Sequence, residues 1–185
     1  MIIGITGTIG AGKGTIVDYL IENFAFHHYS VRQFLIEEAE RRGLPLNRDV
    51  YVAIANELRE KNSPSYITDQ LHQIAIEKGG NAVIESIRTP GEIESLRKKG
   101  DFFLLAVDAE PQLRYERIIV RNSETDQISF DTFVANEKRE MTSTDPNKQN
   151  LSECIKQADF VIRNDHDIPT LHAQIDQIVT KYLKN

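Results

Sequence analysis

A glycine-rich stretch near the start of the chain, "GITGTIGAGKGT" at 4–15, limits the possible folds of this protein more than any other feature. A buried strand is predicted before it, over Ile2 to Thr6, and a helix after it, from about Lys13 to Asn23. Glycine lets a backbone turn sharply and approach another group closely because it has no Cβ. A strand, such a loop and a helix in this order are typical of an α/β sheet that binds a ligand at the loop.

The spacing of the loop indicates phosphate binding. Gly7, four residues, Gly12 and Lys13 fit the P-loop pattern, although Gly14 separates the lysine from the hydroxyl residue Thr15. Backbone N–H groups of such a loop and of the helix start point at an anion. We expect Lys13 to meet the β- and γ-phosphates of ATP and Thr15 to meet a phosphate or Mg²⁺. The residues expected to bind the nucleotide here are Gly7, Gly10, Ala11, Gly12, Lys13, Gly14 and Thr15.

Apolar runs and helical patterns alternate along the rest of the chain. Strands are expected at 2–6, 27–30, 82–84, 102–107 and 160–162. Helices are expected at 13–23, 31–42, 47–61, 64–78, 90–99, 111–121, 130–142 and 169–183. Continuous apolar strands that alternate with helices favour a parallel sheet covered on both faces. We therefore predict one three-layer α/β domain over 1–185, with a five-stranded parallel sheet.

Composition and charge exclude several other classes. The net charge is −6, whereas a nucleic-acid binder usually has a basic surplus. No apolar run is long enough to span a bilayer and no signal peptide precedes the first strand, so we expect a cytoplasmic protein without a membrane partner. Cys154 is the only cysteine, so no internal disulfide can form, and we expect it to be a small buried apolar group.

A P-loop alone does not fix the reaction. GTPases normally add a D-x-x-G segment, which is absent, and an N-K-x-D segment, from which the residues at 164–167 differ at the second position. Large motors and AAA-type ATPases need a longer chain. These arguments leave small P-loop enzymes and nucleotide-binding modules.

Several segments together resemble the nucleoside monophosphate kinase family. "GTIGAGKGT" is similar to its P-loop, with Ile9 in place of the usual proline, and "YSVRQFL" lies where its acceptor-binding helices begin. "VIESIRTPGEIESL" and "RYERIIVR" resemble its acceptor-binding turn and its R-x-x-x-R helix. "ADFVIRND" resembles the base-contacting loop of dephospho-coenzyme A kinases. The chain also resembles kinase-like segments joined to deoxycytidylate deaminase domains. It departs from adenylate kinases at Gln33, where they have an acidic residue.

The resemblance, together with positions in the predicted sheet, suggests four catalytic side chains besides Lys13. Glu85 ends a predicted central strand, where a carboxylate can orient Mg²⁺ or accept a proton. Arg88 follows in the same turn, and its planar fork suits an acceptor phosphate. Arg117 and Arg121 share a helix face and are expected to neutralise the transferring phosphoryl group. The metal would lie near Thr15 and Glu85.

Other polar residues are weaker candidates. Asn164 and Asp165 are expected to line the adenine pocket. Arg139, in the helix expected at 130–142, could approach the lid from its other side. Arg114 belongs to the same helix as Arg117 and Arg121 but lies on a neighbouring face. His27 and His28 end a short strand and are expected to be structural.

The helical region at about 31–65 is expected to be an acceptor lobe, and the polar stretch at about 122–129 a short lid. One or two of Arg32, Arg48 and Arg59 would contact the acceptor. The leading hypothesis is an ATP- and Mg²⁺-dependent kinase whose acceptor is a nucleoside or deoxynucleoside monophosphate. The alternatives are a dephospho-coenzyme A kinase and an ATP-binding sensor without turnover. A monomer or a small homo-oligomer is expected.

Overall fold

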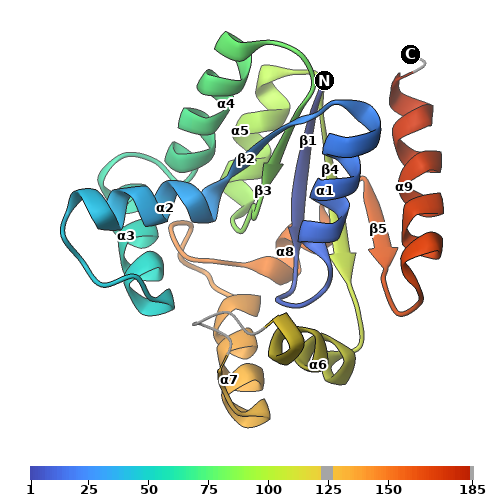
Figure 1. Ribbon diagram of the computed structural model, residues 1–185. Coiled ribbons are helices and arrows are strands. Elements are labelled where there is room, and N and C mark those ends of the chain that lie inside the picture. The colour runs from blue at the N-terminus through green and yellow to red at the C-terminus, as the bar shows by residue number, and fades with distance from the viewer. Residues whose placement is uncertain (122–126, 184–185) are drawn as a thin grey trace.

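The structure of the protein is a computed structural model that describes residues 1–121 and 127–183. Within this part of the chain, five strands form one parallel sheet in the order β2-β3-β1-β4-β5. The strands are β1 (Ile2–Gly7), β2 (His27–Ser30), β3 (Ala82–Glu85), β4 (Phe102–Asp108) and β5 (Phe160–Arg163). The predicted fold class, a three-layer α/β fold with a parallel sheet of five strands, is confirmed (Figure 1).

Helices cover both faces of the sheet (Figure 1). The helices of the described residues are α1 (Lys13–Phe24), α2 (Val31–Arg41), α3 (Arg48–Lys61), α4 (Tyr66–Lys78), α5 (Pro90–Lys99), α6 (Pro111–Arg121), α7 (Phe130–Met141), α8 (Leu151–Lys156) and α9 (Ile168–Leu183).

The side chains of the central strands alternate between two apolar cores. Ile3 and Ile5 of β1 point to one face, where they pack with α1 and α9. Ile2 of β1 and Ile84 of β3 point to the other face, where they pack with α2, α3, α4, α5 and α8. Because both faces are apolar, each strand is buried on two sides, which is why its sequence is a continuous apolar run.

All five strands point in one direction, so their carboxyl ends share one edge of the sheet. The glycine-rich loop follows β1 at this edge, and α6 and α7 lie beyond it (Figure 1). Glu85, Asp108 and Asn164 lie at or just after the ends of β3, β4 and β5. Side chains far apart in the sequence therefore converge where ligands of open α/β sheets bind.

Most predicted boundaries agree with the structure to within two residues, and three points differ. The helix predicted to start at Pro64 begins at Tyr66 with Ser65 as N-cap. Helix α8 was not predicted; it is short, and Asn150 caps it by accepting a hydrogen bond from the backbone N–H of Glu153 at 3.2 Å. Most of the predicted lid, 122–126, lies outside the described residues.

Thr89 and Glu92 form the reciprocal capping box that opens α5. The prediction that Cys154 is a small buried group is confirmed. Cys154 is completely buried, and burial raises the pKa of its thiol well above the ordinary value. In the described part of the chain, no helix has the length and apolarity needed to cross a bilayer.

Candidate nucleotide and acceptor site

Two glycines of the P-loop occupy positions that a side chain could not. Gly10 and Gly12 have φ values of +77° and +104°, in the left-handed region. A Cβ on Gly10 would lie 2.4 Å from the carbonyl oxygen of Arg114, and one on Gly12 would lie 2.4 Å from Nδ2 of Asn164. Gly12 is also the N-cap of α1, whose first turn is capped by no side chain among the described residues. The N–H groups of that turn are therefore available to bind an anion at the loop.

This geometry predicts different effects of alanine at two nearby glycines. Gly12→Ala should lower the free energy of unfolding by about 2 kcal/mol, because it combines left-handed strain with the clash against Asn164. A Cβ on Gly14 would meet nothing within 4 Å, so Gly14→Ala should raise stability slightly. Urea unfolding of both variants tests this, and equal destabilisation by the two substitutions would contradict it.

Lys13 lies folded back against the loop that it follows. Its Nζ donates hydrogen bonds to the carbonyl oxygens of Gly7 at 3.0 Å and of Thr8 at 2.8 Å. Burial lowers the pKa of Lys13 to about 7, and the nearby positive charge of Arg88 acts in the same direction. A buried amine held by two carbonyls needs an anion beside it to be fully charged, as expected of a lysine that binds phosphate.

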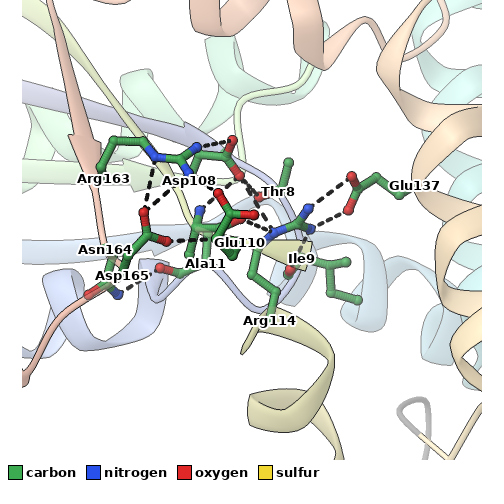
Figure 2. A network of polar contacts seen from close by, with 12 residues as sticks. Thr8, Ile9, Ala11, Asp108, Glu110, Arg114, Glu137, Arg163, Asn164 and Asp165 are labelled. Atoms are coloured by element: carbon green, nitrogen blue, oxygen red, sulfur yellow. Dashed lines mark hydrogen bonds and ion pairs between the residues drawn. The ribbon is translucent and has the colours of Figure 1, made fainter. Parts of the chain in front are cut away.

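Arg114 anchors the P-loop from outside (Figure 2). Its guanidinium donates to the carbonyl oxygen of Ile9 at 3.3 Å and forms a two-point ion pair with Glu137 of α7. Its charge also lies over the ring of Phe133. The side chain is 3% exposed, so Arg114 is a structural residue of the loop rather than a residue of the open site. Its role depends on α7 and could not be inferred from its own helix.

Two further contacts hold the loop against β4 and β5 (Figure 2). The hydroxyl of Thr8 donates to Oδ1 of Asp108 at 2.6 Å, and Nδ2 of Asn164 donates to the carbonyl oxygen of Ala11 at 2.8 Å. Asp165 accepts a hydrogen bond from the backbone N–H of Glu110 at 2.8 Å. Asp165, which was predicted to line the adenine pocket, is therefore engaged in holding the β5 turn.

A first hollow, the donor hollow, opens in front of the P-loop. The predicted nucleotide residues that line it are Gly10, Gly12, Lys13, Gly14, Thr15 and Asn164. Gly7, Ala11 and Asp165 do not line it. Arg117, Arg121 and His166 also line it. Nη2 of Arg117 donates to the carbonyl oxygen of Asn164 at 2.9 Å, and Nη1 is buried without a partner among the described residues.

Glu85 is the last residue of β3 and lines the donor hollow together with the P-loop. Its Oε2 is 3.1 Å from Nε2 of His28, and its Oε1 accepts from the hydroxyl of Ser86 at 3.2 Å. Burial favours a higher pKa for Glu85, but the hydrogen bond with His28 and the charge of Lys13 outweigh it, so the pKa lies below its ordinary value. Glu85 and Thr15 both line the donor hollow, so an ionised carboxylate and a hydroxyl are available there for Mg²⁺.

Two features near Glu85 had no signal in the sequence. His28, expected to be structural, is a direct partner of Glu85. Ser86 has a φ of +72°, which is strained for a serine, and its backbone N–H donates to the carbonyl oxygen of Ile5 at 3.0 Å. Strain of this kind is often held at functional sites by the surrounding structure.

A second hollow, the acceptor hollow, lies between the P-loop and the helices α2 and α3. Its basic residues are Lys13, Arg32, Arg48, Arg59, Arg88 and Arg121. Its apolar wall comes from Val31, Leu35, Tyr51, Val52 and Ala55. Arg32, Arg48 and Arg59, the three candidates for acceptor contact, are therefore all brought to one cavity. Arg139 lies outside both hollows; it is 54% exposed and pairs with Asp49 at 3.6 Å.

Glu140 of α7 links the arginines of the acceptor hollow, and sequence reasoning missed it. It forms ion pairs with Arg48 and with Arg88, the second at 2.8 Å. Arg88 also donates to Gln149 Oε1 at 2.8 Å. Burial favours a higher pKa for Glu140, but the charges of Arg88 and Arg48 outweigh it and leave the pKa below its ordinary value. The two guanidinium groups are thus held in place by one buried, ionised carboxylate.

The two hollows meet at Gly10, Lys13, Glu85 and Arg121, which line both. Of the five predicted catalytic residues, Lys13, Glu85 and Arg121 lie at this junction. Arg88 lies on the acceptor side and Arg117 on the donor side. The arrangement can hold two anionic ligands end to end, with the P-loop lysine between them.

The family is shown by a family model that matches most of the chain. A model of the AAA domain matches residues 3–145, which include the P-loop, β3 and the arginine helix α6. The chain belongs to the AAA domain family. The length argument in the sequence analysis, which set AAA-type ATPases aside, was therefore wrong at the level of the family. An AAA domain with an intact P-loop implies nucleotide binding.

Individual relatives match nearly the whole chain. The chain is 28% identical over 190 residues to a UPF0200 protein of Pyrococcus abyssi, covering 99% of this chain and 97% of that one. Among solved structures, TT1252 from Thermus thermophilus has a TM-score of 0.62 at 18% identity, covering 98% and 97% of the two chains. The shikimate kinase of Bacteroides thetaiotaomicron has a TM-score of 0.59 at 16% identity, covering 97% and 98%. This AAA domain therefore has a P-loop kinase-like fold.

Proposed function

We propose that the protein is an ATP-dependent kinase that transfers the γ-phosphoryl group to a nucleoside or deoxynucleoside monophosphate. The observation that supports this most is the junction of the donor and acceptor hollows at Lys13. An ATPase needs one nucleotide hollow and a water, whereas a second hollow rich in arginine is suited to a second anionic substrate. The similarity of the fold to that of a small-molecule kinase supports the same reaction class.

The donor would be held by the P-loop and α1. Lys13 and the N–H groups at the start of α1 would bind its β- and γ-phosphates. Mg²⁺, when bound, would neutralise charge on those phosphates, and Thr15 and Glu85 would hold it. Catalysis would then consist mainly of positioning and charge neutralisation, with Arg117 and Arg121 lining the same hollow as the P-loop.

The acceptor hollow is lined by cations that suit a phosphate monoester. Beyond the residues shared with the donor hollow, its lining has four arginines. Two buried carboxylates hold three of them in place: Glu140 pairs with Arg48 and Arg88, and Glu92 pairs with Arg59. A guanidinium presents a planar pair of donors, which suits the oxygens of a phosphate. The helices α2 and α3 would form the acceptor lobe.

The test is ADP formation from Mg-ATP with a panel of acceptors, namely the ribo- and deoxynucleoside monophosphates and dephospho-coenzyme A. We expect one or a few monophosphates to raise the rate far above the acceptor-free rate, with the phosphorylated product seen by mass. Stimulation by dephospho-coenzyme A alone would identify the alternative kinase. ATP binding without ADP formation across the panel would contradict the proposal and favour a sensor.

ATP binding should also be linked to proton uptake. Lys13 in the free protein has a pKa of about 7, and adjacent phosphates favour its charged form, so binding raises that pKa. Between the two values the free protein holds fewer protons than the complex, so ATP affinity should fall as pH rises above 7. Calorimetry at about pH 8 in buffers of different ionisation enthalpy should show uptake approaching one proton. Equal uptake by Lys13→Met would contradict the assignment to Lys13.

A further inference from the structure

Helix α3 presents a regular stripe to the acceptor hollow. Arg48, Val52, Ala55 and Arg59 recur at spacings of three and four residues, so they share one helix face, and all four line the hollow. The stripe has an arginine at each end and small apolar side chains between them. Its ends are separated by three helical turns, about 16 Å along the axis. An elongated ligand with an apolar middle and two polar ends fits such a surface.

The two ends of the stripe belong to different parts of the site. Arg48 pairs with Glu140, which also pairs with Arg88. The charges that act on Lys13 include those of Arg88, Glu140 and Arg121. The phosphate end of an acceptor therefore belongs with this group, beside the P-loop. Arg59, by contrast, pairs with Glu92 at the start of α5. The other oxygen of Glu92 accepts from the backbone N–H of Arg88, so Arg59 lies near the backbone of Arg88, whose guanidinium extends to Glu140.

Arg59 is a buried cation with hydrogen-bonding capacity left over. It is 2% exposed, and its Nη2 donates to Oε1 of Glu92 at 2.9 Å. Its Nε and Nη1 have no partner among the described residues. Leaving such donors unpaired in a buried position is costly, and a guanidinium can only donate. Because Glu92 already balances the charge, an uncharged carbonyl oxygen is sufficient as the missing partner.

We propose that Arg59 determines base specificity by donating to a ring carbonyl at the end of the acceptor remote from its phosphate. This inference rests on the proposed function in that it places a nucleoside monophosphate in the acceptor hollow. The apolar stripe and Tyr51 would pack against the ring. Uracil, thymine and guanine present a carbonyl at that remote position. Cytosine and adenine present an amino group there, which cannot accept from an arginine.

Two matched pairs of ligands test this contact, namely UMP against CMP and IMP against AMP. Within each pair the ring size is equal and the carbonyl at the remote edge is replaced by an amino group; inosine monophosphate is used because, unlike GMP, it has no 2-amino group. Calorimetric titration of the full-length protein, with a non-hydrolysable ATP analogue present, should show the carbonyl ligand of at least one pair binding about 10- to 100-fold more tightly. Equal affinities within both pairs would overturn the inference.

A double variant tests whether the preference comes from Arg59. Arg59→Gln alone would leave Glu92 buried without its cation, so Glu92→Gln is added, which also preserves the capping box of α5. The preference in Arg59→Gln/Glu92→Gln should fall to within about threefold. Arg41→Gln, at an exposed arginine of α2, is the matched control and should keep the wild-type preference.

The outcomes separate this inference from the proposed function. A preference for the carbonyl ligands without any phosphoryl transfer would support the role of Arg59 and contradict the kinase. Phosphoryl transfer without any such preference would support the kinase and contradict the role of Arg59. An unchanged preference in the double variant, with thermal unfolding showing a folded protein, would overturn the role of Arg59. If the double variant does not fold, the wild-type titrations alone decide.

Discussion

Lys13→Met should bind ATP more weakly and should lose phosphoryl transfer by about 10²- to 10³-fold or more. Methionine keeps the length of the side chain but removes the charge at the junction of the two hollows. The fold should survive, because burying this amine already disfavours its charged form, and an apolar side chain avoids that desolvation. Steady-state ADP formation with the best acceptor of the panel, alongside thermal unfolding, measures both effects.

The control for this substitution is Lys98→Met on α5. Lys98 is exposed and, within the described part of the chain, pairs with Glu94 one turn earlier, so its removal should leave transfer unchanged and cost little stability. Full activity in Lys13→Met would contradict the assignment of the P-loop lysine to the donor phosphates.

Arg88→Lys is the second variant expected to have a large effect, and its effect should be confined to the acceptor. Nη1 of Arg88 contacts both Glu140 and Gln149. Lysine keeps the positive charge but cannot offer a phosphate the planar, two-donor fork of an arginine. The value of kcat/KM for the acceptor should fall by about 100-fold, while the Kd for ATP changes by less than about threefold. Initial rates at varied acceptor concentration and a separate ATP titration give the two quantities.

Arg97→Lys provides a comparison in helix α5, which follows Arg88. Arg97 is part exposed and donates to the carbonyl oxygen of Gln157 at 2.6 Å, outside both hollows. Its substitution should leave the kinetics unchanged. A loss of ATP affinity in Arg88→Lys equal to the loss for the acceptor would place Arg88 on the donor and contradict the arrangement proposed here.

The parts of this site that could be predicted are those set by short sequence patterns. The P-loop spacing located Lys13 and Thr15, because the glycines must adopt backbone conformations closed to other residues. The end of a buried strand located Glu85, because parallel strands end at a common edge. The alternation of apolar strands with helices along the chain was sufficient to predict the fold class. A parallel sheet covered on both faces requires only that both of its faces be apolar.

The parts that could not be predicted depend on contacts between distant segments. Glu140 lies 52 positions from Arg88 and 92 from Arg48, and nothing in its own helix marks it as their partner. His28 lies 57 positions from Glu85. These contacts arise only when the sheet brings the ends of its strands together, so local sequence patterns do not predict them.

The central claim is that donor and acceptor meet at Lys13, and a joined ligand tests it most directly. The ligand is adenosine linked through five phosphates to the nucleoside of the best acceptor, titrated calorimetrically against the protein. We predict binding of one ligand per protein, about 100-fold tighter than either nucleotide alone, with loss of that gain in Lys13→Met. Affinity no greater than that of ATP, with the monophosphate still binding in its presence, would show that the two hollows do not form one site.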